Sequence, residues 1–146
     1  MSEFSELAKN YYENGCSCSE AVIKAAYDIG IYKSNNIDEI YKIASMFSGG
    51  MSSGCVCGAV AGSQIVLGCL FGKDSSGKTN LNRTVASDFV KKFKEKRKVT
   101  CCASLSAPYK DKPVERRQNC VSIVEESAQI LEKLVNSYLE KTGINS

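Results

Sequence analysis

The sequence predicts an all-α, single-domain bundle of five to six helices that spans residues 1–146 and surrounds a buried central helix rich in Gly and Ala. Apolar residues recur at the i, i+3, i+4 spacing of amphipathic helices through most of the chain. No stretch shows the alternation expected of a strand, and 146 residues are enough for one domain with its own core. Helices packed on helices are therefore the expected architecture.

Two amphipathic helices are expected at the start of the chain. The apolar side chains of residues 4–12 fall on one stripe, and Gly15 is expected to end this first helix. The second helix follows a Cys-Ser-Cys-Ser run in which Ser17 or Ser19 can serve as the N-cap. Cys18 is therefore expected at a helix start and on the inner face of that helix.

The third helix leads into the segment around which the rest of the chain is expected to pack. The Asn-Ile-Asp-Glu run at 36–39 is similar to a capping box and predicts where this helix begins. The Gly/Ser-rich stretch 46–53 predicts a flexible loop, and the fourth helix, 57–71, is apolar nearly all round, as expected for a buried helix. Gly58 and Gly62 share one face of that helix, where the lack of Cβ atoms lets another backbone approach closely.

Two further helices complete the predicted bundle. Thr79 or Asn80 can start the fifth, which ends in the lysine-rich run 91–98, where cations suit the negative end of the helix dipole. The last helix is expected to begin close to Cys120 and to present it inward, and Gly143 can close it. A basic run that no aromatic platform accompanies is more typical of a solvated helix end than of a nucleic-acid site.

The composition excludes several classes of partner and mechanism. A formal net charge of +3 is too small to indicate nucleic acid or a membrane surface as the main partner. The N-terminus is polar, and no window approaches about eighteen uninterrupted apolar residues, so we expect a cytoplasmic protein without membrane insertion. The absence of histidine removes Cys-His catalysis, mixed Cys/His zinc sites and c-type haem attachment.

Eight cysteines are the most informative feature of the sequence. They make up about 5% of the chain, below the roughly 8–10% of small disulfide scaffolds, and in a reducing compartment they indicate metal, cluster or redox chemistry. Most of them fall at expected helix starts or in irregular segments, where helix N-termini can offset the charge of converging thiolates. Cys57 is the first candidate for chemistry, because the start of the Gly/Ala-rich helix favours a thiolate.

Four short motifs resemble those of a known family, in the same order along the chain. They are Gly15-Cys16-Ser17-Cys18-Ser19-Glu20, Cys57-Gly58-Ala59-Val60-Ala61-Gly62, Cys102-Ala103-Ser104-Leu105 and Asn119-Cys120. Together they resemble the redox-active proteins named for their C, GCAxxG, C, C pattern, and the resemblance covers nearly the whole chain. It implies that Cys18, Cys57, Cys102 and Cys120 are the family's cysteines. A related segment precedes the haem domain of split-Soret cytochromes, where it is associated with an iron–sulfur site.

The favoured function is a redox protein in which Cys18, Cys57, Cys102 and Cys120 bind an iron–sulfur cluster and transfer electrons. Such a protein is expected to be a redox accessory protein rather than a stand-alone enzyme. One alternative is a metal-free thiol–disulfide protein in which Cys57 attacks and Cys55 resolves. Another is a zinc- or copper-binding module with cysteine ligands. The sequence does not identify the redox partner protein, and it leaves a homodimer open.

Four further cysteines depart from the family pattern. Cys16, Cys55 and Cys101 neighbour the matched cysteines and are secondary candidates for ligands or for a thiol reserve. Cys69 lies twelve residues beyond Cys57, about 18 Å along a helix axis, so the two cannot share one small cluster. We therefore expect Cys69 to belong to the core.

Overall fold

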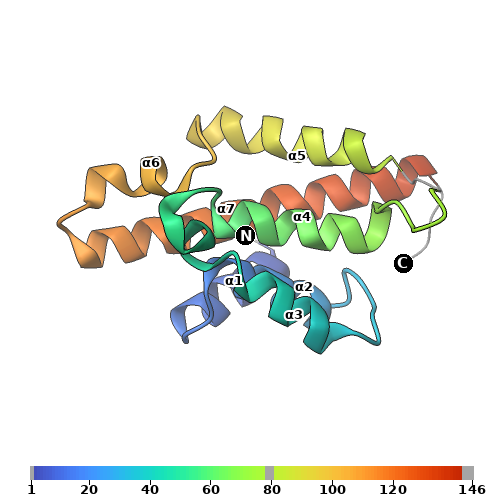
Figure 1. Ribbon diagram of the computed structural model, residues 1–146, viewed down its shortest axis with the longest axis horizontal. Helices are drawn as coiled ribbons and strands as arrows, with labels where there is room; N and C mark the ends of the chain where they lie inside the picture. Colours follow the sequence, from blue (N-terminus) through green and yellow to red (C-terminus); the bar gives the residue numbers. More distant parts are fainter. Residues whose placement is uncertain (1, 78–80, 143–146) are drawn as a thin grey trace.

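The computed structural model describes residues 2–77 and 81–142, and this part of the chain is all-helical, as predicted (Figure 1). It contains seven α-helices rather than five to six. They are α1 (Glu3–Glu13), α2 (Cys18–Asp28), α3 (Ile37–Ser45), α4 (Gly58–Phe71), α5 (Asn82–Arg97), α6 (Cys102–Ser106) and α7 (Pro113–Thr142). Two short turns complete the order, the π-helical η1 (Gly50–Gly54) and the 3-10 helix η2 (Ala107–Tyr109). The unpredicted helix is α6, whose five residues are too few to show a helical period.

The bundle is organised around α4 and α7, which lie against each other. Helix α7 also packs on α1 and α5, while α2 packs on α1 and α4. The largest fully buried side chains come from several helices, among them Phe4, Phe71, Phe89 and Leu131. Nine of the 14 residues of α4 are buried. The helix is not buried on all sides, however, because Gly68 in its last turns is exposed.

The predicted close approach at the Gly face of α4 is confirmed, and the partner is the start of α2. A Cβ atom on Gly62 would lie 2.9 Å from the carbonyl oxygen of Ser19 and 3.0 Å from its Cα. The hydroxyl of Ser19 is buried and donates to the carbonyl of Ala44, at 2.6 Å, at the end of α3. Three helices therefore meet at Ser19, and the residue before it, Cys18, is held by the same contact.

The first turn of α2 is fixed by a capping box. The Ser17 side chain accepts a hydrogen bond from the Glu20 N–H, and the Glu20 carboxylate accepts one from the Ser17 N–H at 3.0 Å. This places Cys18 as the first residue of the helix. The capping box predicted for α3 is absent, because the side chain of its N-cap residue, Asn36, makes no capping hydrogen bond.

The Gly/Ser stretch before α4 is a defined turn rather than the predicted loop. Gly49 and the first residues of η1 have positive φ angles, which include the non-glycine residues Met51 and Ser52. The N–H of Cys55 donates to the carbonyl of Gly50 at 2.9 Å and closes the turn. The left-handed run folds the chain back on itself immediately before α4.

The segment that follows η1 pairs with the segment that precedes α6. Val56 and Cys101 form an isolated antiparallel bridge. The Cys57 N–H donates to the Thr100 carbonyl at 2.7 Å, and the Cys102 N–H donates to the Cys55 carbonyl at 2.5 Å. This short pairing brings the cysteines that precede α4 beside those that precede α6, although the two segments are distant in sequence.

The predicted starts of the fifth helix at Thr79 or Asn80 lie outside the described residues, as does Gly143 at the predicted end of the last helix. Helix α5 ends at Arg97, within the predicted lysine-rich run. In the part of the chain that the structure describes, none of the helices combines the length and the apolarity that crossing a membrane requires.

Candidate functional site

Four cysteines from four separate segments line one cavity beside η1 and α6. They are Cys18, Cys57, Cys102 and Cys120, the same four that the sequence singles out. The cavity has a volume of about 400 Å³ and opens to solvent. Its other lining residues are Tyr12, Ser17, Gly49, Gly50, Gly58, Leu105, Ser106, Lys110, Pro113, Arg116, Arg117 and Ile123.

Three of these cysteines lie at helix starts, as predicted, and the fourth does not. Cys18 and Cys102 are the first residues of α2 and α6, and Cys57 is the N-cap of α4. Cys120 lies in the third turn of α7, so its predicted position near a helix start is wrong. The reason is that α7 already begins at Pro113, whose fixed φ suits the first position of a helix.

Two glycines allow the backbone to run beside the cysteines. A Cβ atom on Gly58 would lie 3.3 Å from the Cβ of Cys18, and one on Gly50 would lie 2.7 Å from the Cβ of Cys102. A side chain at Gly50 would therefore collide with a cysteine of the cavity. The Gly residues of η1 and α4 thus serve the site as well as the helix packing.

The thiols of Cys18 and Cys120 are in hydrogen-bond contact and titrate differently. The hydrogen bond from Cys18 is the largest of the influences that lower the pKa of Cys120 to about 6; Tyr12 and the charge of Arg116 act in the same direction. The pKa of Cys18 is raised by the same hydrogen bond and by burial. Near neutral pH, the metal-free, reduced protein is therefore expected to carry the negative charge of this pair on Cys120.

Burial raises the pKa of Cys57, whereas the sequence predicted a lowered one. Its side chain is only 5% exposed, and this desolvation raises its pKa, although the N–H groups of Val60 and Ala59 act in the opposite direction. The predicted preference for a thiolate at this position is therefore wrong for the metal-free protein. Burial also raises the pKa of Cys102, against the opposing effects of Arg116 and Ser106.

We expect the metal-free protein to lose stability as the pH falls from about 9 to about 6. Because the folded state lowers the pKa of Cys120 from 9.0 to about 6, the ionised thiol stabilises the folded protein at and above pH 9. This contribution shrinks as the pH falls and is lost below about 6. Urea unfolding at pH values from 5 to 9, about the range in which this thiol titrates, measures the trend. The slope should become smaller in Cys120→Ala, and an unchanged slope would contradict the assignment.

The secondary candidates do not line the cavity. Cys16 lies with its Sγ 3.7 Å from the hydroxyl oxygen of Tyr41, and Cys55 is exposed. The Cys101 Sγ lies 3.1 Å from the carbonyl oxygen of Gly54.

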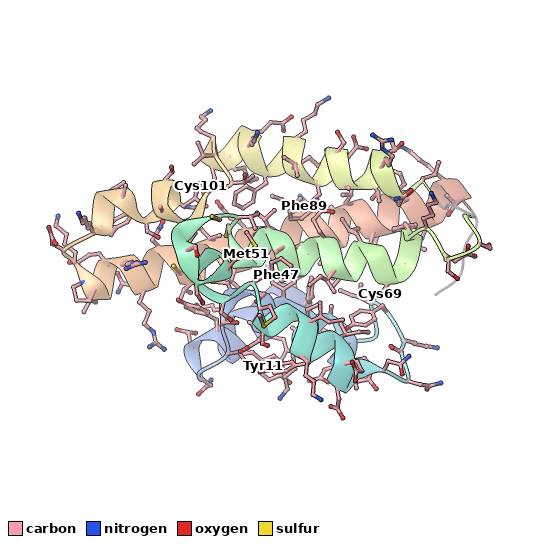
Figure 2. All side chains as sticks on the ribbon, viewed as in Figure 1. Tyr11, Phe47, Met51, Cys69, Phe89 and Cys101 are labelled. Atoms are coloured by element: carbon pink, nitrogen blue, oxygen red, sulfur yellow. The ribbon has the colours of Figure 1, made fainter. Side chains whose placement is uncertain are left out.

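Cys69 is exposed, so its predicted place in the core is wrong. Figure 2 shows it at the far end of α4 from Met51 and Cys101. Gly68 beside it is exposed too, because this side of the last turns of α4 faces solvent. The position of Cys69 far from the cavity agrees with the distance along the helix axis that the sequence predicts between Cys57 and Cys69.

Three cations of the cavity were not identified from the sequence. Lys110, Arg116 and Arg117 line it, and none of the acidic residues in the described part of the chain does. Arg116 and Arg117 lie four and three residues before Cys120 in α7, which places them on the same side of that helix. The spacing is visible in the sequence, but it indicates a shared helix face only if α7 is known to begin before Arg116.

The acidic and thiol side chains do not form a simple mononuclear site. Within residues 2–77 and 81–142, no three Cys, Asp or Glu side chains are arranged to hold a single metal ion.

The comparisons with known proteins identify one family. A family model described as "Putative redox-active protein (C_GCAxxG_C_C)" matches residues 16–134, a range that contains all four cavity cysteines. No curated protein and no solved structure is similar enough to the chain to count as a match.

Proposed function

Because the chain belongs to the C_GCAxxG_C_C family of redox-active proteins, we propose that it is an electron-transfer protein that binds an iron–sulfur cluster through Cys18, Cys57, Cys102 and Cys120. The observation that carries this proposal is the convergence of these four cysteines on one cavity from four different segments. Four thiolates are the ligand set that such clusters most often use.

The cavity fits a polynuclear group better than a single ion. Each iron of a cluster takes its own thiolates, so the sulfurs need to surround a volume rather than meet at one point. The cavity of about 400 Å³ offers that volume. Gly50 and Gly58 keep the backbone free of side chains where it borders the cysteines. The space beside the cysteines is therefore what supports a cluster in this proposal.

The surrounding residues are suited to tune a bound cluster, which would supply one-electron transfer. Tyr12 is placed to hydrogen-bond the sulfur of Cys120, and Ser106 that of Cys102. Hydrogen bonds to the sulfurs and neighbouring cations stabilise the more negative, reduced state and so raise the reduction potential. The charge of Arg116 acts on both cysteines in this way.

Anaerobic purification followed by iron and acid-labile sulfide analysis tests the proposal. We expect a coloured protein with iron and sulfide in equal amounts and a visible absorption that bleaches on reduction. A colourless protein that contains zinc, with thiols released when the zinc is removed, would replace the proposal with the structural-metal alternative.

A thiol–disulfide protein is the second candidate, and the contact between Cys18 and Cys120 favours it. An external disulfide such as glutathione disulfide would accept two electrons and two protons in all; the two cysteine thiols would become one S–S bond, and the oxidant two thiols. The pair expected from the sequence, Cys57 with Cys55, is less suited, because Cys57 is buried and Cys55 is exposed. One reversible disulfide between Cys18 and Cys120, in a protein that binds no iron, would support this candidate.

A further inference from the structure

We propose that the mouth of the cysteine cavity is a docking surface for the acidic face of a partner protein. The surface consists of Lys110, Arg116 and Arg117, with Val114 beside them. The inference extends the proposed function, since the partner would be the protein that exchanges electrons with the site.

The three cations lie on one structural unit. The hairpin formed by α6, η2 and the first turns of α7 projects beyond the rest of the bundle (Figure 1). Lys110, Arg116 and Arg117 belong to this hairpin, are solvent-exposed and border the cavity. The guanidinium of Arg117 donates to the carbonyl of Glu13 at 2.8 Å, which ties the hairpin to the end of α1.

The charge at the mouth is not neutralised within the described part of the chain. Neither Lys110 nor Arg116 has an acidic ion-pair partner there, and no carboxylate lines the cavity. Arg97 shows the contrast, because it pairs with Glu126 at 2.5 Å and also donates to Asn119. Asp111 and Glu115 belong to the same hairpin but are not among the lining residues of the cavity, and Glu20 lies with Arg117 at a neighbouring hollow. The charged side chains that border the cavity itself are therefore the three cations.

Exposure and composition indicate a protein partner rather than a small anion. A site for a small anion would hold its cations inside the cavity, whereas these three are exposed at its edge. Val114, an apolar residue between the two groups of cations in sequence, is 66% exposed. An apolar contact among arginines is typical of protein interfaces, and complementary charge increases the rate of encounter. Weak redox complexes use small interfaces of this kind.

The experiment compares two triple variants that remove the same charge. The hairpin variant carries Lys110→Gln, Arg116→Gln and Arg117→Gln. The control variant carries Lys92→Gln, Lys96→Gln and Lys133→Gln, in a groove between α5 and α7 that contains none of the cavity cysteines. Both variants change the formal net charge from +3 to 0. Any difference between them therefore reports the location of the charge and not its amount.

The first measurement uses the metal-free protein and a fluorescently labelled decaglutamate peptide as a model of an acidic surface. We expect the wild type and the control variant to bind it in low salt and the hairpin variant to bind about tenfold more weakly. Arg116→Lys together with Arg117→Lys keeps the charge and should retain binding. Equal weakening in both triple variants, or tight binding of inorganic phosphate without peptide binding, would overturn the proposal.

The second measurement uses the purified protein with its cluster and two small oxidants of opposite charge. The reduced protein should be oxidised faster by anionic hexacyanoferrate(III) at low salt than at high salt, while cationic hexaamminecobalt(III) should show the opposite dependence. The hairpin variant should lose this salt dependence, with rates expressed per bound iron. Retention of the dependence would overturn the docking proposal. Absence of iron would contradict the proposed function instead and would leave the peptide measurement to decide on docking.

Discussion

Replacing Cys57 with serine is expected to abolish iron–sulfur binding while leaving the fold intact. A serine hydroxyl is a harder and far less acidic ligand than a thiol, so one position of the proposed ligand set would be lost. Cys57 is also the N-cap of α4, and serine is among the preferred N-cap residues. The folding of α4 should therefore survive the change. Iron and sulfide content after anaerobic purification, together with urea unfolding of the metal-free protein, measures the two effects separately.

Cys69→Ser is the matched control for this substitution. Cys69 lies in the same helix but is exposed and does not line the cavity. We expect its replacement to leave the iron content unchanged and to alter the unfolding free energy by less than about 0.5 kcal/mol, as for most surface substitutions. Equal loss of iron from both variants would mean that the cavity is not the binding site. Retention of iron by Cys57→Ser would remove this residue from the ligand set.

Periodicity and small-residue spacing were enough to predict the fold class and the main helix contact. Apolar stripes located five of the seven α-helices of the described chain, and the apolar run of residues 57–71 located α4. The Gly58/Gly62 face predicted a close backbone approach, and α2 makes that approach through Ser19. Both predictions rest on local rules that do not require knowledge of distant contacts.

The parts that could not be predicted depend on non-local contacts. The pairing of Val56 with Cys101 involves segments too short to show a pattern, yet it aligns two cysteine pairs. The left-handed residues of η1 include Met51, a residue type that gives no signal for such a conformation. The thiolate predicted for Cys57 is wrong, because a sequence shows where a helix begins but not how deeply its first residues are buried. The four cavity cysteines were nevertheless identified, through their order in the family pattern.

Gly62→Ala is expected to destabilise the protein although alanine is the better helix former. The added Cβ would lie 2.9 Å from the Ser19 carbonyl oxygen, a backbone atom that cannot rotate away. Overpacking of this kind costs about 1–3 kcal/mol, and the gain in helix propensity returns about 1 kcal/mol. We expect a net loss of up to about 2 kcal/mol in the urea unfolding of the metal-free protein. Because relief of the clash moves Ser19, and with it Cys18, the proposed cluster should also bind less well.

Gly68→Ala separates the packing effect from helix propensity. Gly68 belongs to the same helix, and a Cβ built on it meets nothing within 4 Å. This substitution should therefore raise the unfolding free energy by up to about 1 kcal/mol, the opposite sign to that at Gly62. If both alanine variants were stabilised, α2 and α4 would be farther apart than the structure places them. The position of Cys18 at the cavity would then lose its physical basis, since the contact of Ser19 with Gly62 is what holds the start of α2 against α4.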